Sequence, residues 1–192
     1  MQIIRTSLAV LGGLTLAAGV ALGASLGAGL HRFDAKAATV YWDMARILAT
    51  TGNAAEATVW KSRVAEGLSF EDVDESLQSL AADLNIRDVG ALPLGEQVAA
   101  MQGTPWRQLK IYLYCNPLTA ARMIEYSDAY AAWLPCRVSL LEDATGALWL
   151  YTLNMDLMIH GGHPLPDALR AEAEDVRRIM LALLERGAAG EF

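Results

Sequence analysis

Cys115 and Cys136 are the only cysteines in the chain, and twenty residues separate them. In an oxidising compartment they could form a disulfide, and closing a loop of that length is worth about 3 kcal/mol in the chain-entropy model. They could also act as a metal-binding or redox thiol pair. The third interpretation is a pair of buried apolar thiols, which need no partner. Because the sequence contains no Cys-x-x-Cys, a zinc site or a thioredoxin-like motif has little support.

The densest group of side chains that could bind a metal lies between residues 155 and 163. On an extended strand Asp156, Met158 and His160 would share one face. Imidazole and thioether ligands suit copper, so Met158, His160 and His163 are the candidate metal ligands. The alternative is ordinary structure, because methionines fill gaps in cores and His-Gly-Gly-His-Pro is typical of a surface turn. We predict no resident cofactor and keep a metal or a haem as the alternative.

Motifs of known catalytic classes do not occur in the sequence. It contains no Gly-x-Ser-x-Gly, no phosphate-binding glycine-rich loop and no His-Glu-x-x-His. The remaining histidine, His31, directly follows a long uncharged segment and is a poor candidate for a catalytic base. We therefore expect a protein that is not an enzyme, with an enzyme of an unrecognised type as the alternative.

The N-terminal segment is predicted to cross a membrane. The 24 residues from Ser7 to Leu30 carry no charge, and as a helix they would span about 36 Å, against about 30 Å for a bilayer core. We expect residues 1–30 to be a retained anchor, with a cleaved signal peptide as the alternative. Gly19, Gly23 and Gly27 share one helix face, where a transmembrane helix of a membrane complex, or of a second copy, could pack closely.

The charge of the chain argues against some partners. Outside the predicted anchor there are 14 basic and 22 acidic residues. Such a surface repels phosphate backbones, so we do not expect nucleic-acid binding. A short basic leader followed by a long domain predicts a single-pass protein of a bacterial inner membrane with its domain in the periplasm, although the basic residues flanking the span are nearly balanced.

The remainder of the chain is predicted to form a helical juxtamembrane segment, residues 31–66, and an α+β domain, residues 67–192. Ser69 and Asp72 suit the capping of a helix, and Asn116-Pro117 suits the start of another. We expect a small, mainly antiparallel sheet with the last helix packed across it. The expected helices are 54–66, 70–84, 95–101, 117–126 and 166–186, and the expected strands are 86–92, 109–114, 137–142 and 147–159.

Two short motifs resemble a known family. The sequences Tyr-Cys-Asn-Pro at residues 114–117 and Leu-Pro-Cys-Arg-Val at 134–138 are similar to those of the domain-of-unknown-function family 302, and the resemblance covers about residues 61–187. It implies an α+β fold of the TATA-binding-protein-like or helix-grip type and self-association as a dimer. It implies no reaction. The predicted anchor and the segment 31–66 depart from the family pattern.

Two functions are compatible with these features. The first is a non-enzymatic accessory subunit, anchored by its glycine-faced helix in a membrane complex such as a respiratory or electron-transfer assembly. The second is a periplasmic ligand or redox module that binds a metal, a haem or a small sulfur compound. Its candidate residues are Cys115, Cys136, Met158, His160 and His163.

Overall fold

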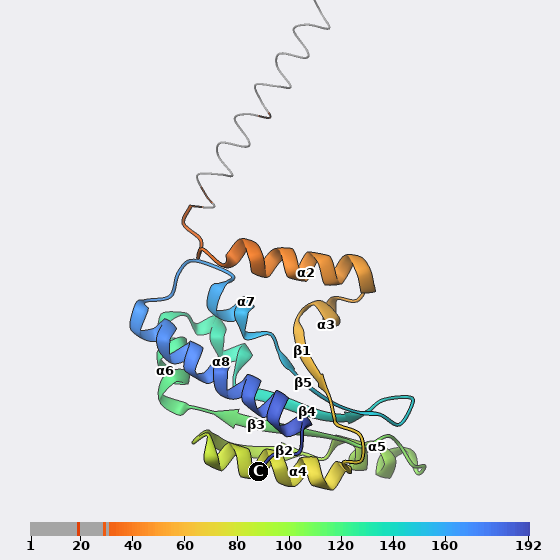
Figure 1. Cartoon of the computed structure of the whole chain (residues 1–192). Helices are drawn as coiled ribbons and strands as arrows, with labels where there is room; N and C mark the ends of the chain where they lie inside the picture. Colours follow the sequence, from red (N-terminus) through yellow and green to blue (C-terminus); the bar gives the residue numbers. More distant parts are fainter. Residues whose placement is uncertain (1–18, 20–28, 30) are drawn as a thin grey trace, which may run out of the picture.

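The computed structural model describes Gly19, Gly29 and residues 31–192, and in this part the chain forms one five-stranded antiparallel sheet packed by helices (Figure 1). The strand order is β1-β5-β4-β3-β2. The α+β prediction is therefore confirmed. The elements are α2 (Ala37–Thr51), α3 (Ala54–Ala57), β1 (Val59–Arg63), α4 (Phe70–Asp83), β2 (Arg87–Leu92), α5 (Leu94–Gln102), β3 (Leu109–Cys115), α6 (Pro117–Tyr126), the 3-10 helix η1 (Asp128–Trp133), β4 (Cys136–Glu142), β5 (Leu148–Leu153), α7 (Met155–His160) and α8 (Asp167–Ala188).

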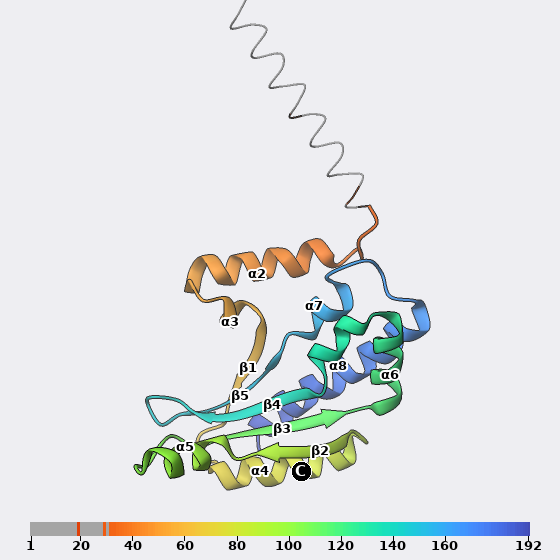
Figure 2. The ribbon, with the colours of Figure 1, turned by 180° about the vertical axis from the view of Figure 1, so that it is seen from behind.

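The core lies between one face of the sheet and two helices. The helices α4 and α8 contact each other and cover the same face, so that the strands lie in front of α8 when the molecule is seen from behind (Figure 2). The apolar stripe of each helix supplies its buried side chains, as the helical spacing predicts. The most deeply buried of these side chains are Val73, Leu77, Leu80, Met180 and Leu183, opposite Tyr112, Tyr114, Val138, Leu140 and Leu150.

The local signals for helix ends are confirmed. Ser69 accepts a hydrogen bond from the Asp72 N–H at 3.1 Å, and the Asp72 carboxylate accepts one from the Ser69 N–H at 2.7 Å, which forms a complete capping box. Asn116 caps α6 and Pro117 is its first residue. These ends depend on neighbours in the sequence, which is why they could be predicted without the fold.

Two predicted elements are wrong. The helix expected over 54–66 ends at Ala57, and Val59–Arg63 form β1 at the edge of the sheet. A domain boundary at residue 67 therefore leaves out a strand of the sheet. The strand expected over 147–159 ends at Leu153, because Asn154 accepts a hydrogen bond from the Asp156 N–H at 2.9 Å and starts α7.

The strand expected over 109–114 is confirmed as β3, and its tyrosines form the buried face. Tyr112 and Tyr114 are almost completely buried against α4, whereas the residues between them lie on the opposite, half-buried face. The Tyr112 hydroxyl donates to Asp74 on α4 at 2.7 Å, and Lys110 donates to the same carboxylate at 2.7 Å. Asp74 therefore holds α4 on the sheet, rather than belonging to a solvated face.

The predicted membrane anchor lies outside the described residues, apart from Gly19 and Gly29. Gly23 and Gly27 belong to the part that is not described, and Gly19 is exposed. Among the residues that the structure does describe, no helix is both long enough and apolar enough to cross a bilayer. The anchor over 1–30 and its glycine face stay predictions.

Candidate functional site

The two cysteines lie at adjacent ends of neighbouring strands. Cys115 is the last residue of β3 and Cys136 is the first residue of β4, where it pairs with Tyr114. With about 5 Å between paired strands and about 3.4 Å per residue along a strand, the two α-carbons are roughly 6 Å apart. Both residues are free thiols in this structure.

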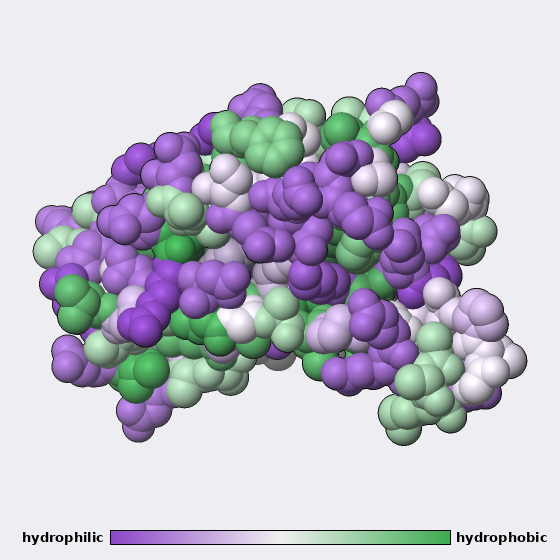
Figure 3. Space-filling view, turned by 90° about the horizontal axis from the view of Figure 1, so that it is seen from below, coloured by the Kyte–Doolittle hydropathy of each residue, from purple (hydrophilic) through white to green (hydrophobic). Residues whose placement is uncertain are grey.

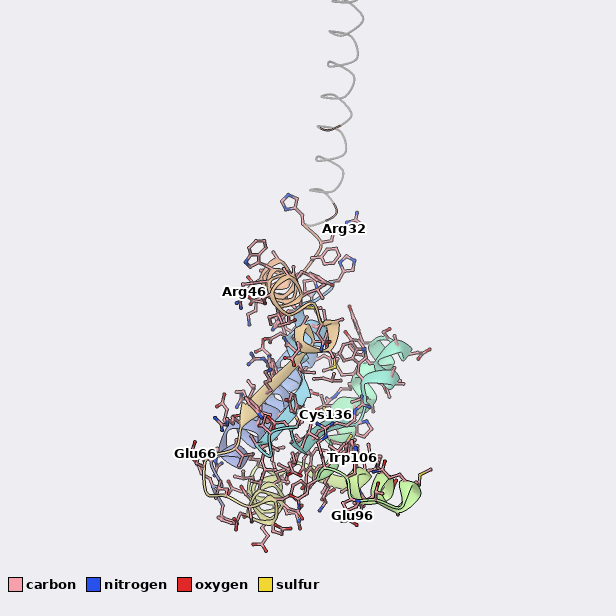
Figure 4. All side chains as sticks on the ribbon, turned by 90° about the vertical axis from the view of Figure 1, so that its right-hand side faces the viewer. Arg32, Arg46, Glu66, Glu96, Trp106 and Cys136 are labelled. Carbon is pink, nitrogen blue, oxygen red and sulfur yellow. The ribbon has the colours of Figure 1, made fainter. Side chains whose placement is uncertain are left out.

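A small cavity lies beside both cysteines, between the sheet and the helices α6, α7 and α8. Five of the nine sulfur-bearing residues of the chain line it, from β4, α6, α7 and the end of β3. Figure 4 shows Cys136 between the end of the molecule that carries Arg32 and the end that carries Glu96. We call these five residues the sulfur pocket: Cys115, Met123, Cys136, Met155 and Met158.

The size of the sulfur pocket limits what it can hold. Its cavity has a volume of about 20 Å³, and about 10–15 Å³ of such volume is enough for one water molecule. A single ion therefore fits between the sulfur atoms without a movement of the helices. A haem is much larger than this cavity, and the binding of a haem or of a small sulfur compound stays a prediction.

The polar side chains around the cavity are engaged elsewhere. The side-chain oxygen Oδ1 of Asn116 accepts a hydrogen bond from the Thr119 N–H at 3.2 Å, and the Thr119 hydroxyl donates to Glu172 at 3.4 Å. The Tyr130 hydroxyl donates to the backbone carbonyl of Met158 at 3.1 Å. Each of these contacts serves a cap or joins two elements. The donor atoms that remain for a bound ion are the thiol and thioether sulfurs.

Burial keeps both thiols protonated at neutral pH. Burial raises the pKa of the Cys136 thiol to about 11, and the nearby Cys115 thiol raises it further. Burial also raises the pKa of Cys115, against a smaller opposing effect of Arg87. Since the thiolate is the reactive form of cysteine, neither residue is a strong nucleophile at neutral pH. A metal ligand is also a thiolate, so binding of a metal would require the loss of these protons as well.

The raised pKa predicts how Cys136 responds to a thiol reagent. We expect alkylation of Cys136 by iodoacetamide in the Cys115→Ser variant to accelerate about tenfold per pH unit up to about pH 11. The alkylation rate of an ordinary exposed cysteine would stop rising near pH 8.5, where its thiol is already ionised. The measurement is the labelling rate by mass spectrometry between pH 7 and 10.5, with the melting curve recorded at each pH as a control. A plateau below pH 9 would contradict the buried, neutral thiol.

The structure does not bring the three predicted metal ligands together. Met158 is in the sulfur pocket, but His163 is exposed and its Nδ1 contacts the Arg32 carbonyl oxygen at 2.7 Å. His160 is 2% exposed and contacts Asp34 instead. In the described part of the chain, no three His, Cys, Asp or Glu side chains gather in the way a metal requires. The strand that would have aligned Met158 with His160 is the helix α7.

His160 connects the start of α2 to the domain. Its Nδ1 is 3.3 Å from the Asp34 carboxylate, and its Nε2 is 3.7 Å from Glu174 on α8 and 3.5 Å from the Lys36 ammonium. Burial acts to raise the pKa of Asp34, but the Lys36 N–H and the His160 ring hold it below its usual value. The arrangement is a buried polar contact between the segment before α2, α7 and α8. It is a structural contact rather than the metal ligand that the sequence suggested.

A second and larger cavity, of about 380 Å³, lies between α4, α5 and β3. Its charged groups include Asp74 and Lys110, which are paired with each other, so the pKa of Asp74 stays below its usual value although burial acts to raise it. The sequence did not predict this cavity, because residues from three distant segments form it. Its wall combines this ion pair with three further charged side chains, Glu71, Glu96 and Arg107, and with apolar side chains.

The fold and the pocket define a class of small α+β domain with a sulfur-lined cavity between its sheet and its helices. The model of a family described as "Domain of unknown function DUF302" matches residues 60–187. This is more than half of the chain, so the chain belongs to that family. The match runs from β1 to α8 and confirms the resemblance of the two cysteine motifs, whereas α2 and α3 precede it.

A solved structure shares this fold. It is the crystal structure of an uncharacterized conserved DUF302 protein from Bacillus stearothermophilus, with 18% identity and a TM-score of 0.53. The similarity covers 67% of this chain and 97% of that one. At this identity the similarity concerns the fold alone. No curated protein matches the chain.

Proposed function

We propose that the protein is a non-enzymatic, membrane-anchored module whose sulfur pocket binds one Cu(I) ion. The observation that carries the proposal is the convergence of two thiols and three thioethers on a cavity of single-ion size. Thiolate and thioether sulfur are soft ligands that select Cu(I). The ligands come from β3, β4, α6 and α7, so a bound ion would join the sheet to the helices.

Binding of Cu(I) would be coupled to protons. A cysteine must lose its proton to become a metal ligand, and both thiols are neutral at neutral pH because burial raises their pKa. Up to two protons are therefore released for each ion bound, and the affinity rises with pH. The test is to load the reduced full chain with Cu(I) without oxygen and to compete with a chromophoric chelator. One ion per chain supports the proposal, and less than a tenth of an ion opposes it.

The membrane anchor and the periplasmic location are part of the same proposal. The support for them is the uncharged segment from Ser7 to Leu30 and the basic residue before it, Arg5. An oxidising periplasm would also favour a disulfide between Cys115 and Cys136, which would compete with the ion. The long helix α8 packed across an antiparallel sheet supports an architecture of the TATA-binding-protein-like or helix-grip type.

The second candidate function is an accessory subunit of a membrane complex, such as a respiratory or electron-transfer assembly, with no ligand of its own. The observation that favours it is the spacing of Gly19, Gly23 and Gly27, which would place three small residues on one helix face. A second copy of this chain is the alternative partner for that face. This candidate does not need the sulfur pocket, so the two can be tested separately.

The glycine face predicts the effect of a single bulky residue. We expect Gly23→Leu to release the protein from its complex during gentle detergent extraction, because the side chain separates the two helices. The measurement is mass spectrometry of the proteins that co-purify with a C-terminally tagged chain. Ala21→Leu is the matched control, since two residues along a helix lie on nearly opposite faces. Equal co-purification of both variants with the wild type would contradict the subunit.

A further inference from the structure

The helix α2 exposes an apolar flank at one end of the molecule. Trp42 is 70% exposed and Tyr41 is 48% exposed, and Leu48 lies one helical turn and a half further along, also exposed. Ala45 and Ala49 complete this flank, which carries no charged side chain. Nothing in the described part of the chain covers it. A soluble surface rarely leaves a large tryptophan so far exposed beside other apolar side chains without a partner.

The other sides of α2 are already occupied. Val40 is buried, Met44 and Ile47 are half-buried, and the helix contacts α3 and α7. The polar side, with Thr39 and Asp43, faces a cavity of about 310 Å³ that Arg177 of α8 also lines. The exposed flank is therefore the one side of α2 that has no neighbour among the described residues.

The chain that leads into α2 is fastened to the domain. The Arg32 carbonyl accepts a hydrogen bond from His163, the Asp34 N–H donates to the Gly162 carbonyl at 2.8 Å, and the Tyr41 hydroxyl donates to the Gly161 carbonyl at 2.6 Å. These bonds hold residues 32–41 on the loop 161–163. The start of α2 consequently has a fixed position relative to the sheet, and α2 lies at the end of the domain where the chain enters (Figure 1).

The charge of the segment that contains α2 differs from that of the rest of the described domain. Residues 31–51 carry three basic and two acidic side chains, whereas residues 52–192 carry 11 basic and 20 acidic ones. Figure 4 shows Arg32 and Arg46 at this end and Glu66 and Glu96 at the opposite end. Seen from that opposite end, the surface is mainly hydrophilic (Figure 3). Residues 31–51, which include the apolar flank, therefore lack the excess of acids that residues 52–192 carry.

We infer that α2 lies along the lipid surface, with the side chains of Tyr41, Trp42 and Leu48 in the headgroup region. This inference rests on the proposed anchor. The uncharged segment ends at Leu30, and seven residue steps of at most about 3.6 Å keep Ala37 within about 25 Å of that point. Tyrosine and tryptophan are the residues that favour the membrane–water interface, and an amphipathic helix lies in its plane. The fastened loop then fixes the orientation of the whole domain on the membrane.

The experiment uses the full chain in vesicles of phosphatidylcholine and phosphatidylglycerol with bromine near the headgroup end of the acyl chains. Bromine quenches tryptophan fluorescence at contact. The chain has five tryptophans, so the contribution of Trp42 is obtained by comparison with Trp42→Phe. The matched control is Trp106→Phe, because Trp106 lies toward the opposite end of the molecule (Figure 4). Flotation of each protein with the same vesicles tests independently whether its N-terminal segment is anchored in the membrane.

The expected result is flotation of all three proteins, with most of the bromine quenching lost in Trp42→Phe and kept in Trp106→Phe. Flotation with equal quenching in all three would overturn the contact of α2 with lipid and leave the anchor standing. Acrylamide quenches tryptophan that is exposed to water. If Trp42 were shielded from acrylamide but not quenched by bromine, a protein partner or a second copy would cover the flank, and this result would also overturn the inference. Absence of flotation would remove the anchor and this inference together.

Discussion

Replacing both cysteines of the sulfur pocket with serine is expected to lower the affinity for Cu(I) at least 100-fold. The three thioethers that remain are weak neutral ligands, and a serine hydroxyl is a hard ligand that does not suit Cu(I). The measurement is competition with a chromophoric Cu(I) chelator for the wild type and for the Cys115→Ser, Cys136→Ser double variant. Both are reduced beforehand, so that a disulfide does not mask the site.

Controls separate loss of the ligands from loss of the fold. The double variant keeps the volume of the pocket nearly unchanged, and its melting curve without metal shows whether the domain is folded. Met101→Leu is a matched control, because Met101 is the most exposed large apolar side chain of the described residues and lies outside the pocket. Met158→Leu is expected to weaken binding about tenfold. Unchanged affinity of the folded double variant would exclude the thiols as ligands.

The second large effect is expected at the contact between Asp34 and His160. His160→Leu leaves the Asp34 carboxylate, 8% exposed, without the ring that lies 3.3 Å away. Leaving a buried polar group without its partner costs about 1–3 kcal/mol, and more for a charged group such as this carboxylate. Because α2 joins the domain through this region, we expect the cost to appear as local opening of α2, by a factor of at least about 100.

Hydrogen exchange of residues 37–51 in the detergent-solubilised chain measures that opening. The sheet serves as an internal reference, since the core between β3, β4, α4 and α8 does not include His160. Two further variants sharpen the result. Asp34→Asn combined with His160→Leu should recover part of the protection, because the uncompensated charge is gone, and His31→Ala should change little because that side chain is exposed. Equal protection in His160→Leu and the wild type would refute the contact.

The sequence was informative wherever neighbours along the chain decide the structure. The capping pair at Ser69 and Asp72 and the Asn116-Pro117 start of α6 are signals within four residues, and both are confirmed. The end of β5 also had such a signal in Asn154, but the apolar run that follows it was equally compatible with a strand. The edge strand β1 was missed because five residues after an alanine-rich stretch give too short a pattern to separate from a helix.

The sulfur pocket was only partly visible in the sequence. Cys115, Cys136 and Met158 were predicted as side chains that could bind a metal, but the helical crossover of α6 and η1 means that the spacing of the cysteines in the sequence does not show that they are neighbours. Their proximity follows from the register that pairs Tyr114 with Cys136. Met123 was missed because it sits in an ordinary amphipathic helix, where a methionine predicts packing. A long-range contact of this kind needs the sheet order, which the sequence pattern does not specify.

The contacts of Asp74 and His160 were missed for the same reason. Asp74 belongs to a run of acids that is typical of a solvated helix face, yet its partners Lys110 and Tyr112 are on β3. His160 occurs in a turn-like sequence, yet its partner Asp34 is more than a hundred residues away. In both cases a charged side chain that looked exposed is held by an opposite charge from a distant segment, and that partner is what permits its burial.

X-ray absorption of the Cu(I)-loaded full chain tests the central claim most directly, because it reports the atoms that surround the ion. The sulfur pocket predicts a first shell of two or three sulfur atoms and no nitrogen, with the two thiols among them, and the sulfur scattering should fall sharply in the Cys115→Ser, Cys136→Ser double variant. A shell dominated by nitrogen or oxygen would place the ion at the histidines or at the surface and contradict the account, as would a chain that retains no Cu(I).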